Sequence, residues 1–275
     1  MTAILELSGL TRRFGGVTAL RGVSFAVGEG ELVALIGPNG AGKTTCFNVI
    51  DGTLRPDAGA VRFAGARIDG LAPETIARRG IGRTFQVAST FGSMTVREGI
   101  AIAVAARERR DGRFASGPLA THSAAIDGLV AAAGVEALAD QQCSTLAWGD
   151  TKRVELALVR AGSPRLMLLD EPAAGLEPDA RRILMREASA LARSEGVAVL
   201  FSEHDMDVVF GFADRVVVLD RGIVIADGPP SAIRASATVA EAYLGTPVPA
   251  PDATGAGGGV SGPAARGSAR EPRQG

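Results

Sequence analysis

The sequence predicts an α/β fold in which helices cover a mainly parallel sheet. Short apolar or alternating segments, which predict strands, are separated by helical stretches along most of the chain. A glycine-rich segment directly follows one of these predicted strands, as in phosphate-binding α/β folds. The chain has 275 residues, of which 46% are hydrophobic and 21% are charged, so a sizeable core is possible.

The first part of the chain is predicted to contain mainly strands. Three short segments are β-branched or alternating and are separated by glycine: Ile4 to Leu7, Val23 to Val27 and Glu31 to Ile36. A helix is expected to begin near Lys43, after the glycine-rich segment. Arg62 to Ile68 predicts a short strand pair that turns at Gly65.

The second part of the chain predicts two buried strands and a hairpin. Leu166 to Leu169 and Val197 to Phe201 are apolar runs, and a helical stretch from Asp179 to Arg193 separates them. Two further strands flank a predicted turn at Asp220-Arg221-Gly222, namely Val216 to Leu219 and Ile223 to Ala226.

Two regions depart from this alternation of strands and helices. Val96 to Gln142 is rich in Ala, Arg and Glu, so we expect a helical subdomain at about 96–160, with a flexible loop around Asp111 to Pro118. Thr246 to Gly275 is rich in Pro, Gly, Ala and Ser and has almost no large apolar residue. Such a tail cannot bury enough surface to fold, so residues 246–275 are predicted to be disordered.

Composition and charge argue against several classes of function. The formal net charge is −1 and there is one Trp and one Tyr, so no nucleic acid is expected as a partner. Cys46 and Cys143 are far apart and lie in no metal-ligand cluster, which argues against a zinc site or a disulfide. No signal peptide or membrane-spanning stretch is predicted, so we expect the protein in the cytoplasm.

The strongest motif is the glycine-rich segment, which has the pattern GxxxxGK[ST]. Backbone N–H groups of such a loop surround phosphate oxygens, and the start of the following helix favours negative charge. Lys43 is expected to reach the β- and γ-phosphates of ATP, and the Thr44 hydroxyl to bind Mg²⁺. The predicted ATP-binding residues of this segment are Gly37, Pro38, Asn39, Gly40, Ala41, Gly42, Lys43, Thr44 and Thr45.

A second motif is the pair of acids that ends an apolar strand, Asp170 and Glu171. Buried strands rarely end on two carboxylates unless a cation or a reaction requires them. Asp170 suits a role in holding Mg²⁺, and Glu171 is then placed to activate the attacking water as general base. The alternative is a solvated strand end, which the presence of the phosphate-binding motif in the same chain disfavours.

Together these motifs resemble those of the ATP-binding subunits of ABC transporters, over nearly all of Ile4 to Gly245. The resemblance implies a P-loop ABC ATPase cassette at 1–245, with a mainly parallel core sheet, an N-terminal antiparallel β subdomain and a helical subdomain. Weaker matches follow in the family's order. The first, Arg12-Arg13-Phe14-Gly15, implies that Phe14 stacks on adenine, and the second, Gly82-Arg83-Thr84-Phe85-Gln86, implies that Gln86 contacts Mg²⁺ and the attacking water. The third, Ala173-Ala174-Gly175-Leu176-Glu177, implies a contact with a second ATPase. The fourth, Ser202-Glu203-His204-Asp205, implies that His204 contacts the γ-phosphate.

One segment departs from the family pattern. The signature that faces the ATP of the opposite subunit usually reads LSGGQ, and here the equivalent residues are Leu146, Ala147, Trp148, Gly149, Asp150 and Thr151. Ala147 replaces a serine whose hydroxyl bonds the γ-phosphate. Losing one such bond costs about 1.5–3 kcal/mol. Two explanations stay open: a competent but slower site, or a second, different ATPase subunit that supplies the standard signature. We favour the heterodimer.

The branch of the family follows from the pairing of GRTFQ with EPAAGLEP and with Glu241-Ala242-Tyr243-Leu244-Gly245. This combination resembles the larger ATPase subunit of the branched-chain amino-acid importers. It implies an ATPase of an importer for branched-chain amino acids or a related small solute, at the cytoplasmic face of the inner membrane. The partners implied are two permeases, a second ATPase and, indirectly, a periplasmic or extracellular solute-binding protein.

Three apolar residues of the predicted loop after Gln86, namely Val87, Phe91 and Met94, suit contact with a permease, although local packing explains them equally well. Three other functions remain possible. They are a lipid or lipopolysaccharide export ATPase, a soluble ABC ATPase of translation or DNA repair, and a nucleotide-binding regulator with little turnover.

Overall fold

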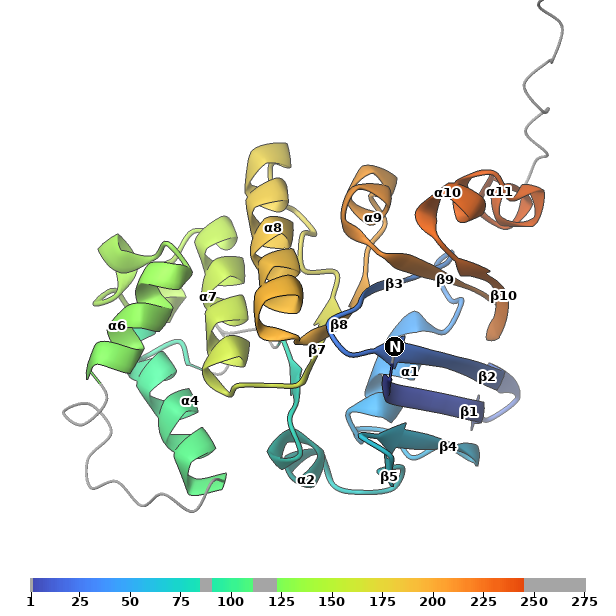
Figure 1. The fold of residues 1–275 in the computed structure, drawn as a ribbon, viewed down its shortest axis with the longest axis horizontal. Helices are drawn as coiled ribbons and strands as arrows, with labels where there is room; N and C mark the ends of the chain where they lie inside the picture. Colours follow the sequence, from blue (N-terminus) through green and yellow to red (C-terminus); the bar gives the residue numbers. More distant parts are fainter. Residues whose placement is uncertain (1, 85–90, 111–122, 245–275) are drawn as a thin grey trace, which may run out of the picture.

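The structure, a computed structural model, describes residues 2–84, 91–110 and 123–244, and it contains two sheets (Figure 1). The larger sheet has six strands in the order β10-β9-β3-β8-β7-β6. All of its neighbouring strands are parallel except β9 and β10. Its strands are β3 (Leu32–Ile36), β6 (Ile81–Arg83), β7 (Leu166–Asp170), β8 (Ala198–Ser202), β9 (Arg215–Asp220) and β10 (Ile223–Gly228).

The smaller sheet is antiparallel and comes from the N-terminal part of the chain. Its order is β2-β1-β4-β5. The strands are β1 (Ala3–Phe14), β2 (Val17–Gly28), β4 (Ala58–Phe63) and β5 (Ala66–Arg67).

Alternating side chains of the six-stranded sheet build two different cores. Val33 and Leu35 of β3 face the core that also contains α1 (Lys43–Ile50) and the antiparallel sheet. Leu32, Ala34 and Ile36 face the core formed with α8 (Pro178–Glu195) and α9 (Met206–Phe212). Because successive strand residues point to opposite faces, a fully buried strand of five apolar residues serves both layers.

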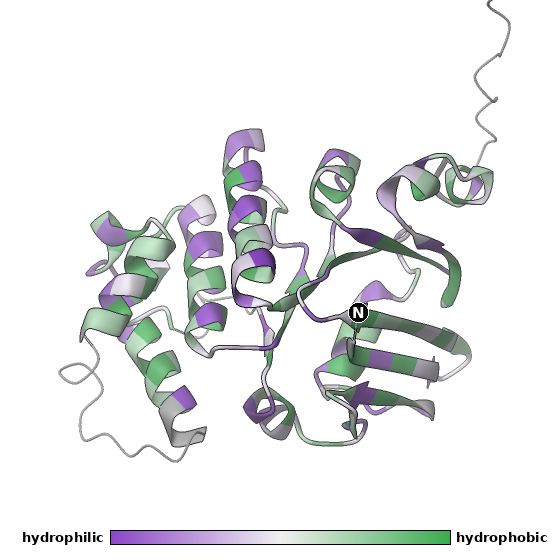
Figure 2. Cartoon of the chain, viewed as in Figure 1, coloured by the Kyte–Doolittle hydropathy of each residue, from purple (hydrophilic) through white to green (hydrophobic). Residues whose placement is uncertain are grey.

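Helix α8 shows how the sequence determines a covering helix. Its buried residues recur at the spacing of one helical face: Leu184, Met185, Ala188, Leu191 and Ala192. In Figure 2 the helix carries both purple and green residues, as expected when one face is buried and the other is in contact with water.

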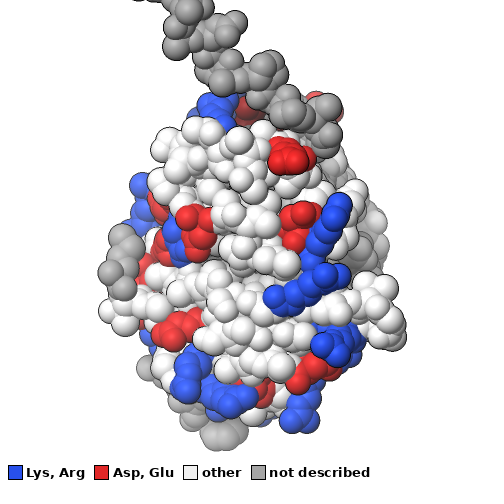
Figure 3. Space-filling model, turned by 90° about the vertical axis from the view of Figure 1, so that its right-hand side faces the viewer, with Lys and Arg blue, Asp and Glu red and all other residues white. Residues whose placement is uncertain are grey.

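Charged residues of both signs are interspersed on the face of the molecule drawn in Figure 3.

A helical region packs beside the end of the large sheet that carries β6 (Figure 1). It contains α4 (Val96–Arg110), α6 (Ser123–Ala132) and α7 (Trp148–Ala161), with short 3₁₀ turns at Glu136–Leu138 and Cys143–Thr145. These segments share an apolar core of their own, which includes Ile100, Val130 and Val154.

Three short helices complete the described chain: α2 (Pro73–Arg78), α10 (Pro230–Arg234) and α11 (Ala237–Leu244). Within residues 2–84, 91–110 and 123–244, no helix combines the length and the apolar character needed to cross a membrane.

The predicted α/β fold, with its mainly parallel sheet, antiparallel N-terminal sheet and helical region, is confirmed. The hairpin at Asp220-Arg221-Gly222 is also confirmed, since Asp220 pairs with Ile223. Strand β6 was not predicted as a strand, because it has only three residues and one of them is glycine. The predicted loop at Asp111 to Pro118 and the tail at 246–275 lie outside the described residues.

Candidate nucleotide site

The site lies where three neighbouring strands end. Strands β3, β8 and β7 are adjacent and parallel, so their carboxyl ends meet at one edge of the sheet. The glycine loop follows β3, Asp170 ends β7 immediately before Glu171, and His204 follows β8. Ligands of open α/β sheets bind at this edge, and the fold therefore brings together motifs that lie far apart in the sequence.

The glycine loop has a backbone that side chains would not permit. At Gly37, with φ 153°, an added Cβ would lie 2.1 Å from the carbonyl oxygen of Leu219. At Gly42, which precedes α1 with φ 108°, it would lie 2.6 Å from the carbonyl oxygen of Ala19. The loop is thus packed tightly against neighbouring backbone and leads into the N-terminus of a helix, which favours anions.

Lys43 is held inside this loop. Its Nζ donates to the carbonyl oxygens of Gly37 at 2.7 Å and Pro38 at 3.3 Å, and only 7% of the residue is exposed. Burial lowers the pKa of the Lys43 ammonium, whereas the negative charges of Glu171 and Asp170 raise it. The cation therefore lies within electrostatic reach of both strand-end acids. Thr44 is exposed at the start of α1.

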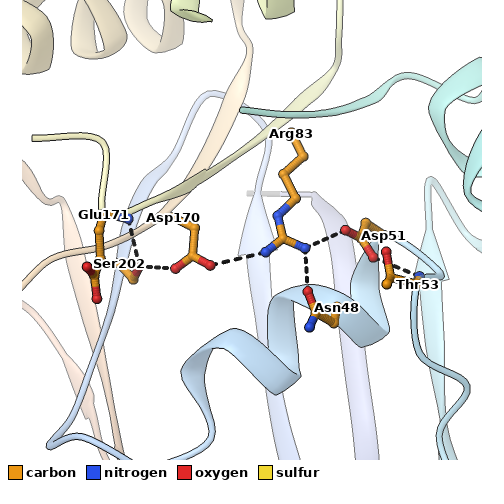
Figure 4. Close-up of polar contacts among 7 residues, drawn as sticks. All are labelled: Asn48, Asp51, Thr53, Arg83, Asp170, Glu171 and Ser202. Atoms are coloured by element: carbon orange, nitrogen blue, oxygen red, sulfur yellow. Dashed lines mark hydrogen bonds and ion pairs between the residues drawn. The ribbon is translucent and has the colours of Figure 1, made fainter. Parts of the chain in front are cut away.

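The Asp170 carboxylate has a protein partner on each oxygen (Figure 4). The Ser202 hydroxyl donates to Oδ1 at 2.7 Å, and Arg83 donates to Oδ2 at 3.1 Å. A carboxylate has about four lone-pair positions, so Asp170 keeps acceptor capacity for a cation. In the described part of the chain, no group of three or more His, Cys, Asp or Glu could hold a metal. Mg²⁺ requires no such group when phosphates supply further ligands, so Thr44 and Asp170 fit Mg²⁺ bound with ATP.

Glu171 has a left-handed backbone, with φ 50°. This conformation costs about 1–3 kcal/mol for a residue other than glycine. It is supported by the Glu171 N–H, which donates to both the carbonyl and the hydroxyl oxygen of Ser202, with the amide nitrogen 3.1 Å from each. The Glu171 Oε1 lies 2.7 Å from Nε2 of His204, and 43% of the Glu171 side chain is exposed. The carboxylate is thus oriented by His204 and accessible to water.

Glu203, which follows β8, was not among the predicted site residues. Only 4% of this residue is exposed, and its Oε1 accepts from the N–H of Ala173 at 2.7 Å. Burial raises the pKa of Glu203, and the nearby charge of Glu171 raises it further. Glu203 therefore fixes the segment that follows Glu171. An acid directly after an apolar strand was the available signal.

Arg83 was also missed as an individual residue, although it lies within the quoted segment GRTFQ. Its guanidinium contacts Asn48, Asp51 and Asp170 (Figure 4). The network joins the helix of the glycine loop to the acid at the end of β7. Because its partners are distant in sequence, local pattern gave no signal for these contacts.

The predicted signature residues lie at the start of α7. Ala147 is the N-cap residue and provides no side-chain hydrogen bond, and the neighbouring Gly149 and Asp150 lie in the first turn. Trp148 is 55% exposed, and its Nε1 donates to the carbonyl oxygen of Ala174 at 2.9 Å. The signature segment is therefore bonded to the loop that follows Glu171.

The other predicted site residues have different positions. Phe14 ends β1, is 44% exposed, and lies under the Arg12 guanidinium, whose carbon is 4.9 Å from the ring centre. The exposed part of the Phe14 ring is available for stacking. Gln86 and Val87 lie outside the described residues.

A largely apolar groove of about 420 Å³ lies between the large sheet and the helical region. Elements α2, β6, α4 and α7 contribute to it, as does the described part of the loop after Gln86. Its apolar lining includes Ile76, Ile81, Phe91, Ala103, Leu158 and Val159.

Comparison with known proteins identifies two matching family profiles. The profile described as ABC transporter matches residues 20–174. The profile described as branched-chain amino acid ATP-binding cassette transporter matches residues 224–249.

Curated relatives cover most of the chain. The high-affinity branched-chain amino acid transport ATP-binding protein BraF of Pseudomonas aeruginosa is 40% identical over 251 residues, 88% of this chain and 98% of that protein. The corresponding protein LivG of Escherichia coli is 39% identical over 251 residues, again 88% of this chain and 98% of that protein.

Solved structures agree with these relatives. The crystal structure of an ATP-binding cassette of an ABC transporter in its ADP conformation is 28% identical, with a TM-score of 0.78 over 90% of this chain and 100% of that chain. A nucleotide-free cassette from an ABC transporter has the same identity and TM-score, over 89% of this chain and 100% of that chain.

Proposed function

This chain belongs to the ABC transporter family of ATP-binding proteins, and we propose from that premise that it is the ATP-hydrolysing subunit of an importer. The solute is a branched-chain amino acid or a related small molecule, as in the relatives named above. The observation that carries the chemistry is the contact of 2.7 Å between Glu171 and His204, at the strand edge that also holds the glycine loop.

In this proposal the glycine loop binds ATP. Backbone N–H groups of the loop and the start of α1 surround the phosphates, and Lys43 transfers its hydrogen bonds from Gly37 and Pro38 to phosphate oxygens. Phe14 stacks on the adenine ring. Each of these groups positions the nucleotide rather than reacting with it.

The acids and His204 then act on the attacking water. Glu171 accepts a proton from that water, and His204 orients the Glu171 carboxylate and contacts the γ-phosphate. Thr44 and Asp170, with Gln86, are assigned to Mg²⁺. When bound, Mg²⁺ neutralises charge on the β- and γ-phosphates.

The partners are assigned to two surfaces. Two permeases contact the apolar groove, where Phe91 is a lining residue. A second ATPase faces the signature at the start of α7, where the absence of a hydroxyl on Ala147 supports a heterodimer with unequal sites. A solute-binding protein completes the importer, and the chain lies at the cytoplasmic face of the inner membrane.

The domain boundaries are part of the same proposal. The cassette is assigned to residues 1–245, and its helical subdomain to about 96–160. The separate apolar core of α4, α6 and α7 supports the second assignment.

Hydrolysis is tested by the change Glu171→Gln. The variant should bind the fluorescent analogue MANT-ATP as well as the wild type does, while its ATPase rate falls by about 10²-fold or more. The exposed Glu6 on β1 gives the matched control Glu6→Gln, which should leave both quantities unchanged. Equal ATPase rates for wild type and Glu171→Gln would remove Glu171 from its assigned role.

Transport is tested by reconstitution. The chain is combined in liposomes with its partner permeases, second ATPase and solute-binding protein, and uptake of labelled leucine, urea and an aromatic acid is compared. ATP-dependent uptake that disappears with Glu171→Gln supports the importer, and the preferred solute identifies the branch. Export of lipid by the same assembly would contradict it.

A further inference from the structure

Arg83 connects two parts of the nucleotide site that are distant in sequence. It is the last residue of β6, and only 14% of its side chain is exposed. Its Nη1 donates to Oδ1 of Asn48 at 2.6 Å and to Oδ2 of Asp51 at 2.5 Å, while its Nη2 donates to Oδ2 of Asp170 at 3.1 Å (Figure 4). One guanidinium thus joins α1 and its C-cap residue Asp51 to the end of β7.

These bonds fix the direction of the Asp170 carboxylate. With the Ser202 hydroxyl 2.7 Å from Oδ1 and Arg83 on Oδ2, rotation of the carboxylate would break a bond on one side or the other. Partners that hold a metal-binding carboxylate in one orientation commonly contribute 10- to 100-fold to metal affinity.

The charges support the same role. Asp51 is only 9% exposed, and a buried carboxylate requires a compensating positive charge. The Arg83 guanidinium lies between Asp51 and Asp170 and neutralises part of the charge of both. A lysine at this position would present a compact charge rather than a planar fork, so it would not satisfy both carboxylates equally.

We propose that Arg83 is a positioning residue for the metal-binding edge: it orients Asp170 relative to the glycine-loop helix so that this carboxylate meets a divalent cation bound with nucleotide. The inference rests on the proposed role of Asp170. Arg83 acts through Asp170 and does not contact the reacting atoms.

The test separates metal binding from nucleotide binding in the full chain. Mn²⁺ affinity is measured by electron paramagnetic resonance in the presence of the non-hydrolysable analogue AMP-PNP, and MANT-ATP affinity is measured in EDTA. Arg83→Met should weaken Mn²⁺ binding by about 10- to 100-fold, with metal-free MANT-ATP affinity changed by less than about twofold, because Arg83 acts on Asp170 and not on the phosphates. Arg83→Lys should give a smaller loss in the same direction.

Arg215 provides a matched control. It pairs with Glu31 at 2.7 Å and with Asp227 at 2.6 Å, and it lies on β9 rather than beside Asp170. Arg215→Met should lower thermal stability and leave Mn²⁺ affinity unchanged. Should Arg83→Met fail to fold, Arg83→Lys carries the measurement.

Three outcomes are distinguishable. Unchanged or tighter Mn²⁺ binding in both Arg83 variants would overturn the positioning role. Equal losses of Mn²⁺ and metal-free MANT-ATP affinity would also overturn it, because Arg83 would then be a general support of the site. An Asp170→Asn variant whose Mn²⁺ affinity equals that of the wild type would instead refute the proposed metal-binding role of Asp170.

Discussion

Nε2 of His204 lies 2.7 Å from Oε1 of Glu171, so the residues that follow two neighbouring parallel strands meet at the nucleotide site. Nearly half of each side chain is exposed. An exposed contact of this kind contributes little to stability, about 0–1 kcal/mol. The contact between His204 and Glu171 is therefore expected to orient the Glu171 carboxylate rather than to stabilise the fold.

Replacing His204 with alanine should slow hydrolysis and leave the fold intact. The carboxylate of Glu171 loses its orienting partner, so the ATPase rate should fall by about 10²-fold. MANT-ATP affinity and the melting temperature should stay close to wild type. His204→Gln, which keeps a hydrogen-bonding group, should retain more activity than His204→Ala; similar rates in both variants and the wild type would contradict the assignment.

Replacing Lys43 with methionine should weaken nucleotide binding. The loss of a charge-assisted hydrogen bond, about 1.5–3 kcal/mol, corresponds to roughly 10- to 150-fold in Kd. Fluorescence titration with MANT-ATP measures this change. The sequence contains one other lysine, Lys152, which is paired with Glu155 on α7. Lys152→Met is therefore the control, and it should bind MANT-ATP like wild type.

Replacing Ala147 with serine should stabilise the chain by supplying an N-cap to α7. Ala147 has an extended backbone and no side-chain cap, and a serine there is worth about 0.5–2 kcal/mol. Urea unfolding measures the gain. Ala72, the uncapped N-cap residue of α2, has nearly the same backbone angles. Ala72→Ser therefore serves as the control for the effect of an N-cap hydroxyl alone.

The two serine variants should differ in function. In the proposed assembly, only Ala147→Ser would place a hydroxyl against the ATP of the opposite subunit, so only this change should alter ATP-driven association of the two ATPases. Equal behaviour of Ala147→Ser and Ala72→Ser in that assay would argue that position 147 does not face the partner's nucleotide.

Replacing Glu203 with glutamine should change how stability depends on pH. Burial raises the pKa of Glu203 above its ordinary 4.5, so the folded state binds a proton more tightly than the unfolded state does. Its contribution is therefore fully present below pH 4.5 and is lost as pH rises through the folded pKa. Glu203→Gln keeps an acceptor for Ala173 and removes this titration, so its unfolding free energy should fall less as pH rises.

Glu31 gives the opposite sign and serves as the control. Burial raises the pKa of Glu31, but hydrogen bonds from Arg215 and from the N–H of Gly28 outweigh this effect, so the pKa of Glu31 is lowered overall. Its contribution is present above pH 4.5 and is lost as pH falls through the folded pKa. In urea titrations across this range, Glu31→Gln should therefore lose stability mainly at the higher pH. The same pH response in both variants would contradict the two assignments.

Much of the site could be predicted because its motifs are local. The glycine loop needs particular residues at a fixed spacing after a strand, and the buried strand that ends at Asp170 is visible as a continuous apolar run. The alternation of strands and helices then implies that such strand ends meet at one edge.

The missed features depend on contacts between distant residues. Arg83 lies 35, 32 and 87 positions from Asn48, Asp51 and Asp170 respectively. No local sequence pattern predicts contacts between residues this far apart along the chain. The same holds for the bond between Trp148 and Ala174, which are 26 positions apart. Strand β6 escapes prediction for a different reason, because it is formed by pairing with β7 rather than by its own propensity.

The apolar groove has a thermodynamic consequence. Asp51 and Arg83 line it, and the same Arg83 holds Asp170. Under the proposed role of Arg83, an occupant that shifts this residue changes the affinity for the cation, and linkage then requires the cation to change the affinity for that occupant by the same factor. Because both sites share Arg83, one coupling factor describes how occupancy of the groove changes cation affinity and how the cation changes affinity for the groove's occupant.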